Sequence, residues 1–195
     1  MNRPRFAYYL WGCEKMFKDF LSNFYENLIV ENRWLLMLKG LGITLEVTFF
    51  AVLMGIAIGF IIAIIRSTNE TTGKLKFLNA ICKVYLTVIR GTPVIIQLLI
   101  VYFVIFASVD VNKVVAAVIA FGINSGAYVA EIVRSGIMSI EKGQFEAGRS
   151  LGLNYVQTMT TIVLPQALKN VLPALGNEFI VLLKETSVSG YIALK

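Results

Sequence analysis

The sequence predicts an all-α, polytopic helical membrane protein. Only 15% of its 195 residues are charged and 57% are apolar, whereas roughly a quarter of the residues in a soluble domain are charged. Apolar runs long enough to cross a bilayer recur along the chain. Lysine and arginine outnumber aspartate and glutamate by 18 to 12, and the excess is spread through the loops, where it indicates orientation in the membrane.

Residues 1–42 are predicted to form an amphipathic, extracytoplasmic segment. The stretch FKDFLSNFYENLIVENRWLLMLK mixes charged residues with aliphatic and aromatic ones, and Trp34 is a typical membrane-interface residue. The six basic residues of this segment, set against four acidic ones, argue against its outside location, which rests on the charges of the later loops.

Four membrane spans are predicted, at about residues 43–65, 94–109, 114–133 and 167–188. The first contains one charge in 23 residues and would be about 34 Å long as a helix. A short turn around residues 110–113 joins the second span to the third, so that they form a helical hairpin. The fourth contains Pro173 and Glu178 and therefore must face protein or a water-filled path rather than lipid.

The basic residues orient these spans. The segment 66–90, taken as a loop, carries five basic residues and only one acid, Glu70, which places it in the cytoplasm. Alternation then puts the N-terminus and the turn at 110–113 outside, and the segment 134–166, which includes the coupling segment 141–166, inside.

Several kinds of chemistry are excluded by residues that the sequence lacks. It has no histidine and only two cysteines, which excludes histidine acid–base catalysis, histidine metal ligands, a Ser-His triad and a disulfide framework. It contains no G-x4-G-K-[ST] sequence, so it is not expected to cradle ATP phosphates itself. We therefore expect no catalytic site, no metal site and no bound cofactor. The scattered basic residues also argue against a nucleic-acid partner.

Two glycine pairs lie inside the predicted spans. Gly55 and Gly59 are four residues apart, and so are Gly122 and Gly126. Small residues at this spacing let helices approach closely. We interpret both pairs as packing positions within the chain, with a seam between two subunits as the alternative.

The segment 141–166 is unusually polar for its place between two spans. Helix-forming residues around Glu146 lead to Gly152, which suits a left-handed helix C-cap. A second helical pattern follows from Tyr155 to Leu164, before Pro165 constrains the chain. The pattern predicts a rigid cytoplasmic protrusion made of two short helices with a glycine corner.

The spacing within this protrusion resembles a known motif. The residues Glu146-Ala147-Gly148, Gly152, Ile162 and Leu164-Pro165 follow E-A-A-x3-G-x9-I-x-L-P, with Gly148 in the third position. This is similar to the EAA motif in permease subunits of bacterial ABC importers. The stretches YLTVIRGTP, GAYVAEIVR and LKETS resemble the polar amino acid branch, of the histidine, glutamine, arginine and cystine type. The resemblance runs from about Gly40 onward and implies the transmembrane domain of an ABC type I importer.

In that family the EAA segment docks in a groove of the ATP-binding subunit. The resemblance implies that Glu146, Ala147, Gly148 and Gly152 lie at this interface, and that Ile162, Leu164 and Pro165 anchor the segment at the start of the fourth span. It also implies that ATP and Mg²⁺ are bound by the ATPase subunit. A second permease subunit, identical or related, and an extracytoplasmic amino-acid-binding protein would complete a complex of the bacterial cytoplasmic membrane that works by alternating access.

Polar residues within the spans are candidates for the substrate path. They are Gln97, Asn124, Glu178, Lys184, Glu185 and Thr186. An amino acid zwitterion needs donors for its carboxylate and acceptors for its ammonium group, and this set supplies both. The alternative is that such residues only bridge helices, as Asn124 with Ser125, or pair locally, as Glu131 with Arg134 one turn on.

Two matters stay open at this point. Family members usually continue into a fifth span, whereas this sequence stops at Lys195, so the fifth span is expected to be missing. A channel or secondary carrier, with the polar segment as a structural connector, is the alternative function. An intramembrane enzyme is excluded, because both aspartates lie outside the predicted spans and no histidine is present.

Overall fold

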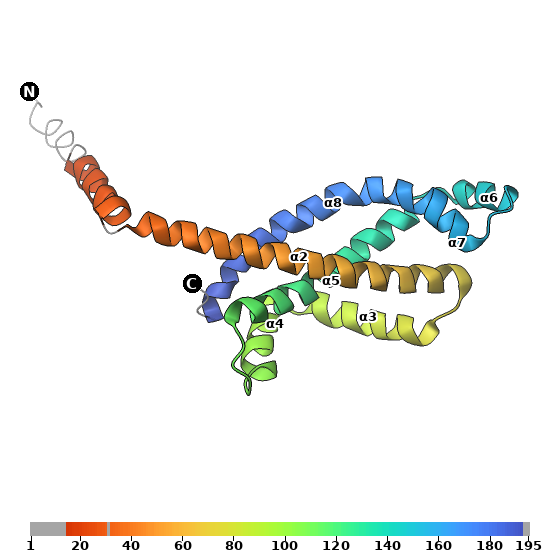
Figure 1. Cartoon of the computed structure of the whole chain (residues 1–195), viewed down its shortest axis with the longest axis horizontal. Coiled ribbons are helices and arrows are strands. Elements are labelled where there is room, and N and C mark those ends of the chain that lie inside the picture. Colours follow the sequence, from red (N-terminus) through yellow and green to blue (C-terminus); the bar gives the residue numbers. More distant parts are fainter. Residues whose placement is uncertain (1–14, 31, 193–195) are drawn as a thin grey trace, which may run out of the picture. The chain divides into compact units, whose positions relative to one another are not determined.

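The computed structural model of the chain describes residues 15–30 and 32–192 (Figure 1). These residues are helices and turns, with no β-strand among them, so the predicted all-α class is confirmed. In chain order the elements are the π-helical turn η1 (Glu26–Val30), α2 (Arg33–Thr72), α3 (Lys76–Gly91), α4 (Val94–Ile100), the π-helical turn η2 (Val101–Ile105), α5 (Lys113–Met138), α6 (Lys142–Ser150), α7 (Tyr155–Thr158), the π-helical turn η3 (Met159–Val163), α8 (Leu164–Glu185) and the 3₁₀-helix η4 (Thr186–Ile192).

The contacts divide the chain into two units, Met1–Ile43 and Thr44–Lys195. In the first unit, the described residues from 15 to 25 are helical. The apolar side chains of Phe17, Phe20, Leu21 and Phe24 recur at the spacing of one helix face, and all four are exposed. This pattern is the one expected of an amphipathic segment. The first 14 residues of the predicted 1–42 segment lie outside the described residues.

Two helices of the described chain are long and apolar enough to cross a membrane. They cover Arg33–Glu70 and Lys113–Met138, while Lys76–Gly91 and Val94–Ile105 together pass the same test but are bent by 108°. The bend falls at Thr92 and Pro93, where proline supplies no backbone N–H to continue the first helix. The first span is therefore embedded in a 40-residue helix, longer than the 43–65 run that apolarity alone indicates.

Helix α3 corrects the interpretation of residues 66–90 as a loop. Cys82 and Leu86 of α3 are buried against Ile62 of α2 and Ala130 of α5. Lys76, Lys83 and Arg90 recur every seven positions of α3, so three of the five basic residues that suggested a loop lie along one face of a packed helix.

The two glycine pairs bring α2 and α5 into close contact. A Cβ atom on Gly55 would lie 2.7 Å from the Ser125 hydroxyl oxygen, and one on Gly59 would lie 2.5 Å from a methyl carbon of Val129. From the other side, Gly126 faces Ile58. The interpretation of these glycines as packing positions within the chain is thereby confirmed, and only hydrogen fits at each of them.

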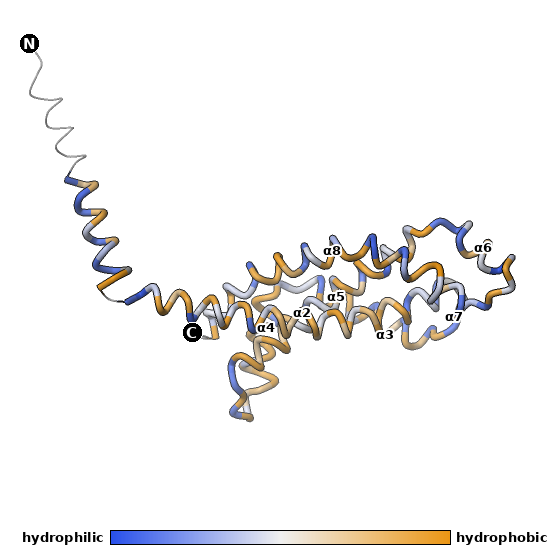
Figure 2. The backbone as a smooth tube through the Cα atoms, turned by 45° about the horizontal axis from the view of Figure 1, so that its top comes forward, coloured by the Kyte–Doolittle hydropathy of each residue, from blue (hydrophilic) through white to orange (hydrophobic). Residues whose placement is uncertain are grey.

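Helix α5 is the central element of the second unit. It packs against α3, α4 and α8, and Asn124 to Ala127 are buried in succession. The C-terminal half of α5 forms an apolar core in which Val129, Val133 and Ile137 pack against Ala167 and Val171 of α8. Figure 2 shows α3, α5 and α8 running together, with α6 and α7 at one end of the bundle.

We expect Gly59→Leu to destabilise the bundle, because the new side chain has no space against Val129. Overpacking of this kind lowers the free energy of unfolding by about 1–3 kcal/mol. The measurement is the temperature at which monodisperse protein is lost in detergent. Ala57→Leu is the matched control, since Ala57 is exposed on the same helix. Equal melting temperatures for the two variants would contradict the proposed contact.

Candidate functional site

The corner of the segment 141–166 is built by Gly152. Helix α6 ends at Ser150, and Gly152 has φ +77°, the left-handed conformation that glycine adopts without strain. The N–H of Leu153 donates to the carbonyl of Gly148 at 3.0 Å, and that of Gly152 donates to the carbonyl of Arg149 at 2.9 Å. These two bonds form a Schellman motif. The left-handed cap expected at Gly152 is confirmed.

The second arm of the corner starts with a capping box. The Asn154 side chain accepts from the N–H of Gln157, and the Gln157 side chain accepts from the N–H of Asn154, both at 2.9 Å. Both bonds hold the first turn of α7 at a defined angle. From Tyr155 the chain stays helical through η3 into α8.

Pro165 therefore does not separate the cytoplasmic segment from the fourth span, as the sequence had suggested. It lies in the first turn of α8, directly after the π-helical turn η3. A proline has no N–H to donate four residues back, and a wider turn at this point accommodates the missing bond. The arm and the span form one continuous helical rod.

The motif residues of this coupling segment, defined as residues 141–166, have different environments. Glu146, Ala147 and Gly152 are exposed, Ile162 is half-buried, and Leu164 packs on the apolar core. Gly148 is buried, and a Cβ atom there would lie 2.5 Å from the Thr158 methyl carbon and 2.7 Å from its hydroxyl oxygen. Gly148 is thus the point at which the two arms touch. Beside it, Leu151 and Val156 leave an apolar surface, 76% and 66% exposed.

Inside the bundle, four polar side chains form a buried polar cluster: Gln97, Asn124, Ser125 and Glu178. The amide of Asn124 donates to Gln97 at 3.0 Å, and the hydroxyl of Ser125 donates to Glu178 at 3.0 Å. The Gln97 amide in turn donates to the carbonyls of Ile89 and Thr92 at the bend. Because polar groups away from water need partners, this cluster joins α4, α5 and α8 at one level.

The remaining path candidates lie at the far end of α8. Lys184 is exposed and Glu185 is half-buried. Thr186 is buried and donates to the carbonyl of Leu183 at 2.7 Å. The structure therefore brings together Gln97, Asn124 and Glu178, and it shows no hydrogen bond from this end of the helix to them within the described residues.

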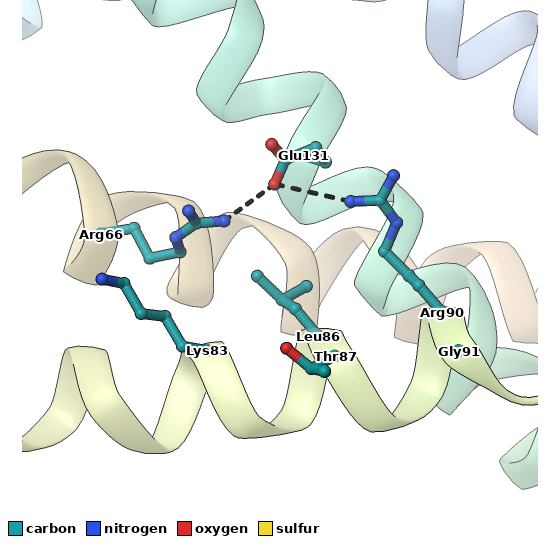
Figure 3. Close-up of a pocket in the computed structure, with 7 residues that line it drawn as sticks. All are labelled: Arg66, Lys83, Leu86, Thr87, Arg90, Gly91 and Glu131. Carbon is teal, nitrogen blue, oxygen red and sulfur yellow. Dashed lines mark hydrogen bonds and ion pairs between the residues drawn. The ribbon is translucent and has the colours of Figure 1, made fainter.

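A network of charges lies toward the C-terminal end of α5, and Figure 3 shows Arg66, Arg90 and Glu131 of it. Glu131 of α5 pairs with Arg134 at 2.6 Å and with Arg66 of α2 at 2.8 Å, and Arg134 stands 3.6 Å from Glu70. The predicted pairing of Glu131 with Arg134 is confirmed. Arg66 was missed because its partner is 65 residues away, and no local spacing indicates such a pair.

We expect Gly148→Ala to destabilise the coupling segment although alanine is the more usual helix residue. The added methyl group overlaps Thr158, at a cost of about 1–3 kcal/mol. Thr158→Ala in the same chain removes the two nearest atoms, so the double variant should recover most of the melting temperature. Gly143→Ala is the control, because no atom lies within 4 Å of a Cβ built at Gly143. Additive effects of the two substitutions would contradict this contact.

Comparison with known proteins assigns the family. Residues 55–195 match the family described as binding-protein-dependent transport system inner membrane component. The chain is 41% identical over 159 residues to the probable amino-acid ABC transporter permease protein YckA of Bacillus subtilis (strain 168), covering 81% of this chain and 68% of that protein. It is 35% identical over 167 residues to the L-cystine transport system permease protein TcyB of the same organism, covering 85% of this chain and 69% of that protein.

Solved structures agree with this assignment. A crystal structure of an amino acid ABC transporter with histidines matches with a TM-score of 0.76 and 41% identity, covering 86% of this chain and 76% of that chain. An inward-facing form of the MetNI methionine ABC transporter shares the fold, with a TM-score of 0.69 at 22% identity over 83% of this chain and 76% of that chain. The chain therefore belongs to the family of binding-protein-dependent transport system inner membrane components.

Proposed function

We propose that this chain is the transmembrane permease subunit of an ATP-driven importer for a polar amino acid. The observation that carries the proposal is the coupling segment. It is a rigid corner, capped on both arms, that presents exposed Glu146, Ala147 and Leu151 at one end of the bundle. Such a surface suits docking into a groove of a separate ATPase subunit, which would bind ATP and Mg²⁺. The chain itself would then catalyse no covalent step.

Mechanical continuity supports the same role. The arm that begins at Tyr155 continues as one helical rod into α8, which carries Glu178 of the buried polar cluster. Two cavities of about 260 and 240 Å³, both lined by Ser67 and Ile137, separate the coupling segment from the end of α2. These cavities leave space for the corner to move and for α8 to tilt relative to α2. Alternating access requires rigid-body movement of this kind. A channel or secondary carrier does not couple transport to an ATPase subunit and so does not need this rigid segment; that alternative is not favoured.

The buried polar cluster is our candidate for the part of the path that meets the substrate. Glu178 offers an acceptor for an ammonium group, and the amides of Gln97 and Asn124 offer donors. Lys184, Glu185 and Thr186 would act at the other end of α8. Relatives named as glutamine, L-cystine and arginine transport permeases support an amino acid as the substrate class.

The remaining components of the importer are proposed from the family. They are a second permease subunit, identical or related, and an extracytoplasmic amino-acid-binding protein. The complex would be a multi-pass assembly of the bacterial cytoplasmic membrane, oriented with the coupling segment inside.

The docking role is tested by co-purification with the ATPase subunit. We expect Glu146→Lys and Gly152→Trp to lose that subunit, the first by reversing a charge at the surface and the second by straining a residue with φ +77°. Asp110→Lys is the control, since Asp110 is an exposed residue of the turn before α5. Wild-type recovery of the ATPase with both corner variants would remove the support for this function.

The path role is tested at Glu178. Glu178→Gln keeps the size and an acceptor for the Ser125 hydroxyl, so the melting temperature should stay near that of the wild type, whereas Glu178→Leu leaves Ser125 unpaired and costs about 1–3 kcal/mol. If the charge binds the ammonium group, Glu178→Gln should lower uptake into proteoliposomes by about tenfold. Unchanged uptake by Glu178→Gln would assign the side chain to helix packing alone.

A further inference from the structure

A cavity between α2, α3 and α5 has an unusual charge. Its volume is about 490 Å³, and its lining includes Arg66, Lys83, Thr87, Arg90 and Glu131. Figure 3 shows Arg66 and Arg90 extending toward Glu131 from opposite sides, with Lys83 on the same helix as Arg90. The volume lies within the range of sites for small organic ligands, roughly 300–1,000 Å³.

The two acidic residues near the cavity, Glu131 and Glu70, already pair with arginines. Each oxygen of Glu131 has a close arginine, Arg134 at 2.6 Å and Arg66 at 2.8 Å, and Glu70 stands 3.6 Å from Arg134. Arg90 is 4.0 Å from Glu131, too far for a hydrogen bond. Lys83 has no carboxylate at ion-pair distance among the described residues. Three arginines, Arg66, Arg90 and Arg134, thus share Glu131 and Glu70, and Lys83 adds a fourth cation, so two positive charges of this cluster have no counter-charge within it.

Lys83 and Arg90 are both exposed, Arg90 by 44%, so both cations are accessible to a counter-charge or to water. Charged side chains within a membrane bundle face a pathway or a partner, because lipid does not solvate them. Lys83, Thr87 and Arg90 lie on one polar face of α3, spaced four and three residues apart, while Ile81, Val84 and Val88 form the exposed apolar face next to it. The cavity therefore offers two cations and a hydroxyl group on one wall.

The cavity adjoins the buried polar cluster. Arg90 is flanked in sequence by Ile89 and is two residues from Thr92, whose carbonyls both accept from the Gln97 amide. Arg90 and Glu131 also line a second cavity of about 460 Å³ that reaches Asn170 of α8. Arg90, which lines both cavities, is thus the cavity residue next to the backbone carbonyls that hold Gln97.

We propose that Lys83 and Arg90 form a binding site for the carboxylate of the amino acid in transit, on the cytoplasmic side of the buried polar cluster. This proposal rests on the proposed importer function. The Arg90 guanidinium, which lies 5.7 Å from the Tyr128 ring centroid, offers two parallel N–H donors that match a carboxylate, and Lys83 adds a mobile point charge. Glu131 is hydrogen-bonded to Arg66 and Arg134 and lies 4.0 Å from Arg90, so Lys83 and Arg90 are the cations of the lining that a ligand carboxylate would bind.

The test uses the complete complex of permease, ATPase subunit and binding protein in proteoliposomes. The probes are radiolabelled glutamine, arginine, histidine and cystine, and the measured quantity is amino acid taken up per ATP hydrolysed. We expect Lys83→Gln and Arg90→Gln each to lower this ratio by about tenfold, as the loss of a charge-assisted hydrogen bond does. Arg90→Lys should recover part of the loss because it keeps the charge. The ATPase subunit should co-purify with all three variants in wild-type amount.

Lys76→Gln is the matched control. Lys76 lies on the same face of α3, outside the cavity lining, so its loss should change the ratio less than about twofold. An unchanged ratio in Arg90→Gln, or an equal fall in Lys76→Gln, would overturn the carboxylate site while wild-type uptake still supports the importer. Failure of the wild type to transport any of the four probes would overturn both proposals.

The lipid composition of the vesicles distinguishes a substrate carboxylate from a lipid phosphate as the anion bound in the cavity. We expect the loss in Arg90→Gln to be the same in vesicles of phosphatidylcholine alone and in vesicles that contain phosphatidylglycerol. A loss confined to the anionic vesicles would mean that a lipid phosphate occupies the cavity, and the proposal would be wrong.

Discussion

The close approach of α2 to α5 is the contact on which the polar interior of this permease depends. Gly55 and Gly59 leave no room for side chains against Ser125 and Val129, so the backbones approach far enough for α5 to be enclosed by its neighbours. In a membrane, apolar surface gains little by leaving lipid, and dense packing of small residues replaces that driving force. Once α5 is enclosed, Asn124 and Ser125 are shielded from lipid and find partners on α4 and α8. The buried polar cluster thus depends on the close helix packing that Gly55 and Gly59 allow.

The burial and the charge of the polar side chains also change along α5. Asn124 and Ser125 are buried and bonded to neutral or singly charged partners, whereas Glu131 and Arg134, two to three turns further on, are partly exposed and engage charges from α2. A fully buried ion would have a large desolvation cost, while a pair beside a cavity keeps part of its hydration. Along α5 the polar groups therefore change from a buried cluster with one carboxyl group, that of Glu178, to a partly exposed network of several charges.

The sequence predicts the parts of this arrangement that have a local signal. The left-handed cap at Gly152, the pairing of Glu131 with Arg134 and the close-packed glycines follow from spacings of at most four residues. The number of basic residues in 66–90 indicates a loop, whereas the seven-residue spacing of Lys76, Lys83 and Arg90 is compatible with one face of helix α3. The continuity through Pro165 depends on the π-helical turn η3, which has no sequence signature. The bonds from Ser125 to Glu178 and from Arg66 to Glu131 span 53 and 65 residues. Such pairs depend on how helices pack, which local spacing does not encode.

Because the helix continues through η3, the coupling segment is joined rigidly to α8, whereas a hinge at Pro165 would uncouple the two. If the chain bent freely at the proline, a force on Glu146 or Ala147 would be lost before it reached the membrane. With the Gly148–Thr158 contact joining the arms and the rod running unbroken into α8, displacement of the corner is transmitted to Val171, which packs on α5, and onward to Glu178. If the proposed coupling role is correct, displacement of these two arms would be carried along α8 to Glu178, which accepts the hydrogen bond from Ser125.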